Sequence, residues 1–186
     1  MSIIDELKKE KNWQSFLKYM KESKLSTQKE KDYIEKYIKQ GKYLDLVGKI
    51  VNGEYYFLPP TKFLTGKEKQ KAFYSYNKDE TMILKLIAYL LKEKYDNYFT
   101  PNCYSNRKNC GVRQGIEYLI SVNHIENLCG YKIDIQDYFN SVKVELLLPK
   151  LKVILENDEK LYDFLETILT DKRVQFKNRT IIEEKG

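Results

Sequence analysis

One aspartate, Asp134, lies in the middle of the short apolar run YKIDIQDYFNSV, between Ile133 and Ile135. A run of this kind is typical of a buried strand. A charged carboxylate is costly there without a partner, so an unpaired one takes up a proton and becomes neutral. A bound Mg²⁺ is one suitable partner, because carboxylates on a rigid strand can hold the two cations that assist phosphoryl transfer. Asp134 is therefore the best candidate for a metal ligand in this sequence. The alternative is a carboxylate that accepts hydrogen bonds from backbone amides at a helix or strand end.

The sequence has few of the residues that other kinds of catalytic chemistry need. Cys103, Cys110 and Cys129 are odd in number, form no CxxC pair and have no histidine at ligand spacing, so they indicate neither a disulfide framework nor a zinc site. The one histidine, His124, falls within a helical pattern and has no nearby carboxylate or thiol to complete a nucleophilic triad. Hydrolase chemistry of the serine or cysteine type is therefore not expected.

Charge is distributed unevenly along the chain. Residues 62–71 hold four lysines and one glutamate, and residues 100–116 hold three cations and no acid. Residues 117–171, by contrast, hold eleven acids and five lysines. The whole chain has 33 Lys and Arg against 27 Asp and Glu, a formal charge of +6. An acidic centre between basic stretches suits a metal site beside a phosphate-binding surface.

Length and composition limit the class of protein. The 186 residues fit one domain, or one domain and part of a second, and 42% hydrophobic residues supply enough apolar material for a core. No window has the eighteen uncharged apolar residues of a membrane span, and the acidic start MSIIDELKKEKN is unlike a signal peptide. We therefore expect a cytoplasmic protein without a membrane partner.

Periodicity predicts a mostly helical chain with two hairpins. Apolar residues recur at helical spacing in seven segments. Ser26 or Thr27 would cap the third and Gly41 would end it, and Asn77 with Glu80 would cap the fourth. Alternating patterns on both sides of residues 65–68 and of Lys177-Asn178 predict β-hairpins, and the run around Asp134 predicts a strand. The expected helices cover residues 3–7, 13–20, 33–38, 77–91, 112–125, 143–155 and 159–169. The fold class is therefore α+β.

The order of these features, from about Pro59 to Gly186, resembles bacterial-type reverse transcriptases, namely group II intron maturases, retrons and abortive-infection enzymes. The most specific piece is YKIDIQDYFNSV, which resembles the family's motif A. The resemblance implies that Asp134 binds two catalytic Mg²⁺ ions and that the backbone of Ile135 supplies another oxygen ligand. It also implies that Phe139 lies beneath the sugar of the incoming nucleotide and favours dNTPs. The same nucleotide-binding segment includes Gln136, Asp137 and Tyr138.

Two further segments resemble the fingers of the same family. KEKQKAFYSYN is similar to the fingers hairpin, in which Lys71 best matches the residue that meets the triphosphate and Lys69 is its neighbour. FTPNCYSNRKNCGVRQGIEYL is similar to a Tyr/Arg turn that contacts the template or the nucleotide. Ordinary core aromatics at 138–139 and a solvated loop at 100–116 are the alternatives. The residues expected to bind nucleic acid are Lys62, Lys67, Tyr104, Arg107, Lys108 and Arg113.

The resemblance implies the fingers and partial palm of a right-hand polymerase, with a small, incomplete antiparallel palm sheet. Residues 1–58 would be an N-terminal helical extension, 59–128 a fingers-like region and 129–186 a partial palm. The family's small-residue/Pro-Ser segment and its turn of paired aspartates do not occur in this sequence. One carboxylate cannot hold two Mg²⁺ ions in catalytic geometry, so we expect this chain to be catalytically incomplete by itself.

The function expected from the resemblance is that of an RNA-directed DNA polymerase, acting on an RNA template, a DNA or RNA primer and dNTPs once a missing C-terminal half is supplied. Its exposed palm strand would pair with that half. Two other interpretations stay open: a non-catalytic RNA-binding or assembly module, and an unrelated helical interaction protein. The sequence does not choose among intron mobility, retron synthesis and antiviral defence.

Overall fold

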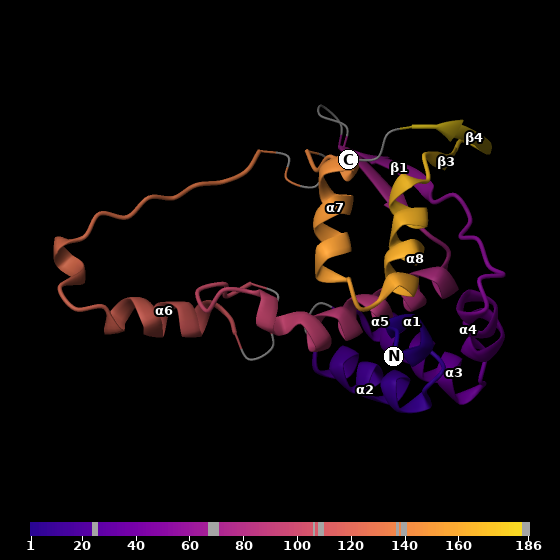
Figure 1. Cartoon of the computed structure of the whole chain (residues 1–186), viewed down its shortest axis with the longest axis horizontal. Helices are drawn as coiled ribbons and strands as arrows, with labels where there is room; N and C mark the ends of the chain where they lie inside the picture. Colours follow the sequence, from indigo (N-terminus) through magenta and orange to yellow (C-terminus); the bar gives the residue numbers. More distant parts are fainter. Residues whose placement is uncertain are drawn as a thin grey trace.

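In the computed structural model, a well-packed body carries a long projecting arm (Figure 1). The structure describes residues 1–23, 26–66, 71–105, 107, 110–136, 138 and 141–183. We call residues 1–95 and 144–183 the body and residues 96–143 the arm. These described residues form eight α-helices, two short 3₁₀ helices and four strands, which confirms the α+β class.

Four helices form the N-terminal part of the body. The predicted capping of the third is confirmed: Thr27 and Glu30 form a reciprocal capping box, and Gly41 follows the helix with a φ of +62° that favours glycine. Trp13 lies fully buried among the apolar faces of these helices and donates a hydrogen bond to the Leu7 carbonyl at 2.8 Å. The sequence predicted three of these helices and missed the fourth. They are α1 (Ile3–Glu6), α2 (Glu10–Glu22), α3 (Gln28–Lys39) and α4 (Tyr43–Val51).

Helix α5 (Lys78–Tyr95) passes through the centre of the body and contacts both α1 and α2. Asn77 caps it by accepting a hydrogen bond from the Glu80 amide at 2.9 Å, as the sequence predicted. Its buried stripe includes Ile83 and Leu86, at the helical spacing that brings side chains to one face. The helix is thus anchored on its apolar side by the N-terminal helices.

Two helices return the chain from the arm to the body: α7 (Val144–Ile154) and α8 (Glu159–Thr170). Both match their predicted positions. Between them, buried Asp158 caps α8 and also accepts hydrogen bonds from the Ile3 amide at 2.9 Å and from Lys94 Nζ at 3.2 Å. One carboxylate therefore ties together α1, α5 and α8.

Both predicted hairpins form, and they join into one mixed sheet. The strands are β1 (Thr61–Thr65), β2 (Lys71–Ser75), β3 (Arg173–Phe176) and β4 (Arg179–Ile182), in the order β2-β1-β3-β4. Each hairpin is antiparallel, whereas β1 and β3 pair in parallel through Thr61 and Gln175. Lys177 and Asn178 both have positive φ, as the two-residue turn between β3 and β4 requires.

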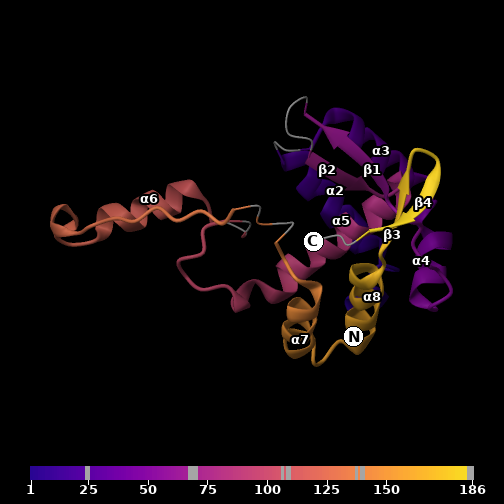
Figure 2. The same ribbon diagram turned by 90° about the horizontal axis from the view of Figure 1, so that it is seen from above.

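The sheet differs from the predicted antiparallel palm sheet in the strands that form it and in the parallel pairing of β1 with β3. The segment around Asp134 does not join it: residues 128–135 have no regular secondary structure and run along the arm in both views (Figures 1 and 2). Helix α6 (Val112–Ser121) is the main element of the arm, flanked by the 3₁₀ helices η1 (Asp96–Tyr98) and η2 (Ile125–Asn127). It ends earlier than predicted, before His124, which has a left-handed φ of 58°.

The described part of the arm contains no buried residue. Its large apolar side chains, on α6 and on the segment that follows, are exposed. Among the described residues, no helix has both the length and the apolar character needed to cross a membrane.

Candidate nucleic-acid interface and the Asp134 segment

The β1-β2 hairpin carries an exposed aromatic pair beside a lysine. Phe63 and Phe73 are directly opposite each other in the register and are 53% and 54% exposed. Lys71, two residues from Phe73, lies on the same face because strand side chains alternate. Aromatic rings next to a cation are the groups that bind bases and phosphates of single-stranded nucleic acid. The predicted neighbours Lys67 and Lys69 lie outside the described residues.

The opposite face of the hairpin is fastened to the C-terminal strands. Lys62 Nζ forms an ion pair with the carboxylate of Glu183, which also accepts a hydrogen bond from the Tyr74 hydroxyl at 3.1 Å. The hydrogen bond and charge of Glu183 raise the pKa of Lys62 above its usual value. A phosphate contact from Lys62, as the sequence predicted, would require this ion pair to open.

Arg107 holds the base of the arm together. Its Nε and Nη2 donate to the Asp96 carboxylate at 3.1 and 2.9 Å, and its Nη1 donates to the Thr100 carbonyl at 2.9 Å. The Arg107 side chain is only 14% exposed, and it lowers the pKa of Asp96. This arginine therefore shapes the 96–107 loop. The sequence signal for the pairing is the lone acid, Asp96, next to an otherwise acid-free basic stretch.

Tyr104 also has a structural role here. Its ring lies against Gly115 of α6, where an added Cβ would come within 3.3 Å of the ring. The glycine thus makes room for the tyrosine. Arg113 is highly exposed on α6 and pairs with Glu117 at 2.8 Å. The predicted contact Lys108 lies outside the described residues.

The Asp134 segment is exposed, so the prediction of a buried strand is wrong for this chain. Tyr131, Ile133 and Ile135 are 91%, 88% and 59% exposed, and Asp134 itself faces solvent. The physical reason is that a strand needs a neighbouring edge for its backbone hydrogen bonds, and no described strand pairs with residues 131–136. The segment therefore keeps its alternating pattern without the partner that this pattern requires.

The remaining nucleotide-site residues follow the same pattern where they are described. Gln136 and Tyr138 are exposed, so Tyr138 is not a core aromatic in this structure. Asp137 and Phe139 lie outside the described residues. Asp134 and Ile135 lie on the arm, whereas Lys71 belongs to the body, and the two regions are apart in both views (Figures 1 and 2). The structure does not bring the predicted site residues together.

The pair of Mg²⁺ ions implied by the resemblance stays a prediction for the described residues of this chain. Among them, no group of three His, Cys, Asp or Glu side chains is arranged to hold a metal ion. Asp134 therefore supplies one carboxylate, and the rest of a two-metal site has to come from elsewhere.

A cavity in the body was not predicted from the sequence. It has a volume of about 490 Å³ and lies between the 53–57 linker, helix α8 and the start of β3. Buried Glu80 positions the linker by accepting hydrogen bonds from the Tyr55 hydroxyl and the Leu58 amide, both at 2.8 Å. Burial and Glu80 together raise the pKa of Tyr55 to about 12. The sequence signal was the aromatic triplet at 55–57, which stands between two helical patterns.

No family model, no curated protein and no solved structure matches this chain.

Proposed function

We propose that this chain is the fingers and partial palm of an RNA-directed DNA polymerase. In this proposal it transfers nucleotides from dNTPs onto a primer, along an RNA template, once the rest of the palm is supplied. The observation that carries the proposal is the exposed alternating segment around Asp134, together with its resemblance to the family's motif A. A segment of this pattern is suited to a sheet that has yet to acquire its other strands.

The alternation of the segment supports this interpretation. In an extended conformation, Tyr131, Ile133 and Ile135 share one side, while Asp134 is on the other with its polar neighbours. An apolar side that faces solvent in the isolated chain is unfavourable, and covering it with a partner would release roughly 25 cal/mol per Å² of apolar surface buried. The same pairing would fix the position of Asp134 on a rigid strand.

The hairpin supports the nucleic-acid part of the proposal. Phe63 and Phe73 offer two adjacent rings for stacking, and Lys71 offers a point charge for phosphate oxygens. Both kinds of contact form without any change in the body. Any Mg²⁺ would be held by Asp134 together with carboxylates of the completing polypeptide.

Primer extension tests the catalytic proposal. The chain is combined with a polypeptide that carries the remaining palm motifs, an RNA template, a primer, dNTPs and Mg²⁺. We expect incorporation that Asp134→Ala abolishes and that Glu145→Ala, a change of an acid in the first turn of α7, leaves intact. Full incorporation by the Asp134→Ala variant would contradict the assigned role.

A non-catalytic RNA-binding module is the second candidate, and the hairpin favours it because its exposed rings and lysine do not depend on Asp134. RNA binding by the chain alone, measured over a range of salt, tests what the two candidates share. Lys71→Ala should reduce the slope of log affinity against log salt by about 0.7 to 0.9, whereas Lys11→Ala, an exposed lysine on α2, should not. Binding that does not change with salt would remove both candidates.

If the chain binds RNA but supports no DNA synthesis when the rest of the palm is supplied, the chain is a non-catalytic RNA-binding module. Synthesis that depends on Asp134 decides for the polymerase.

A further inference from the structure

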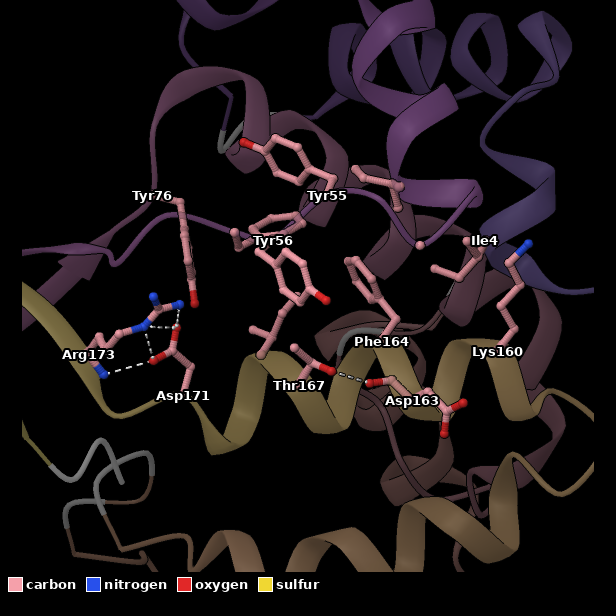
Figure 3. A pocket seen from close by; sticks show the side chains of 14 residues that line it. Ile4, Tyr55, Tyr56, Tyr76, Lys160, Asp163, Phe164, Thr167, Asp171 and Arg173 are labelled. Atoms are coloured by element: carbon pink, nitrogen blue, oxygen red, sulfur yellow. Dashed lines mark hydrogen bonds and ion pairs between the residues drawn. The ribbon is translucent and has the colours of Figure 1, made fainter.

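The cavity of about 490 Å³ has a size suited to one small planar group (Figure 3). Figure 3 shows Tyr55 and Tyr56 of the linker on one side of it and Phe164 of α8 on the other. Its walls come from α1, α4, the linker, the segment between β2 and α5, α8 and the start of β3. They are Ile4, Ile50, Gly53, Tyr55, Tyr56, Phe57, Tyr76, Lys160, Asp163, Phe164, Thr167, Ile168, Asp171 and Arg173.

Five aromatic side chains line the cavity, four of them on the linker and at Tyr76 and one on α8. Phe57 is central, with ring centroids 5.5 Å from Phe164, 5.7 Å from Tyr76 and 5.6 Å from Tyr55, each in an edge-to-face arrangement. Tyr56 lines the same cavity, yet it is 74% exposed and so is available to a ligand. Rings of this kind bind flat groups by stacking and by edge contacts.

Polar groups lie at both ends of the cavity and also between them, on α8. At one end, Arg173 Nη2 pairs with the Asp171 carboxylate at 2.9 Å. At the other end, Lys160 Nζ pairs with Asp5 at 2.6 Å. Between them the Thr167 hydroxyl donates to the Asp163 carbonyl at 2.8 Å and keeps its oxygen as an acceptor. The arrangement suits a ring that is apolar on its faces and polar at its edges.

The cavity is next to the proposed nucleic-acid surface. Tyr76 lines both this cavity and a second hollow, of about 330 Å³, whose wall includes Phe63 of the hairpin. A strand that follows the hairpin face therefore meets the cavity at Tyr76. This continuity favours a nucleic acid over a protein side chain as the occupant.

We propose that this cavity binds one nucleobase, the group shared by single-stranded RNA and free nucleotides. The inference rests on the proposed function in its choice of RNA as the partner. It adds a base-binding site that is separate from both the hairpin lysine and the Asp134 segment. Aromatic stacking on a base is worth about 1–3 kcal/mol, which corresponds to a loss of roughly 5- to 150-fold in affinity when it is removed.

The experiment measures binding of a single-stranded RNA that contains one 2-aminopurine and, separately, of adenosine monophosphate. Thr167→Trp fills the cavity from an exposed position of α8, and Thr170→Trp is its matched control, because Thr170 makes the same hydroxyl-to-carbonyl hydrogen bond outside the cavity. Tyr56→Ala removes the exposed ring. Circular dichroism confirms that each variant is folded.

We expect the 2-aminopurine fluorescence to be quenched on binding, and Thr167→Trp and Tyr56→Ala to weaken binding by about tenfold while Thr170→Trp does not. If RNA binding depends on Lys71 but not on Thr167 or Tyr56, the cavity proposal is overturned and the proposed function stands. If only adenosine monophosphate binds, in a manner sensitive to Thr167→Trp, the cavity is a nucleotide site and the RNA function fails. If neither the RNA nor adenosine monophosphate binds, the base-binding site and the proposed RNA binding are both overturned. If the cavity binds a tryptophan-containing peptide and neither probe, the same conclusion follows.

Discussion

The body and the arm contain the same kinds of apolar residue but use them differently. In the body, Trp13, Ile34 and Leu86 are fully buried. In the arm, residues such as Val112 and Ile133 point mostly into solvent, although α6 is as amphipathic as the helices of the body. Amphipathic pattern therefore decides the local conformation, while burial depends on whether a complementary surface is present. The arm has its local structure and lacks that surface within the described residues.

The largest expected effect is on the packing of the body. Leu86→Ala should lower the free energy of unfolding by about 3–5 kcal/mol, because the side chain is fully buried in the core. Leu119→Ala in the arm is the matched change and should alter it by less than about 0.5 kcal/mol. Urea denaturation measures both. An equal loss of unfolding free energy for the two variants would contradict the distinction between a packed body and an exposed arm.

The next largest effect concerns the carboxylate that joins three helices of the body. Asp158→Ala should lower the free energy of unfolding by about 2–4 kcal/mol, because it leaves the Ile3 and Leu161 amides and Lys94 without their acceptor. Asp45→Ala, at an exposed ion pair on α4, is the control and should cost less than about 1 kcal/mol. A small change for Asp158→Ala would show that the N-terminus is held by other contacts.

A smaller effect is expected for the ion pair between α3 and α5. The hydrogen bond from Lys85 lowers the pKa of Glu30 from 4.5 to about 2, with a further contribution from the Thr27 amide. Since the folded pKa is the lower one, this contribution is complete above about pH 4.5 and is lost as the pH falls toward 2. Glu30→Gln keeps a residue able to complete the capping box but removes the charge, so it should flatten the acid limb of the stability curve. An unchanged acid limb would exclude this pair as its source.

The smallest global effect is expected in the arm. Arg107→Ala should open the 96–107 loop, because it removes three hydrogen bonds that close the loop. Chymotrypsin cleavage near Tyr98 and Tyr104 should become faster, while the unfolding midpoint of the body stays the same. A large drop in that midpoint would mean that the loop supports the body.

The sequence predicted most of the local structure correctly because local signals control it. The Thr27/Glu30 capping box, the Asn77 cap of α5 and the Lys177-Asn178 turn all act within a few residues, and all three formed. Helix α4 was missed, although its pattern of Tyr43, Val47 and Ile50 buries one face. Short helices of this kind give weak periodic signals.

Long-range features were not predictable from patterns alone. The parallel pairing of Thr61 with Gln175 joins residues more than a hundred positions apart, which no local pattern links. The strand around Asp134 was predicted from an alternation that is present, but pairing depends on a second edge that no local pattern supplies. The cavity was not predictable for the same reason, because its walls come from four separate parts of the chain, at residues 4, 50–57, 76 and 160–173.

Hydrogen exchange of residues 128–136 tests the central claim most directly. At concentrations where the chain is monomeric, we expect the amides of this segment to exchange at nearly unprotected rates, while those of α5 are strongly protected. Adding the completing polypeptide should slow exchange at residues 131–135 as the strand acquires a partner. Strong protection of this segment in the isolated monomer would contradict the account of an unpartnered arm.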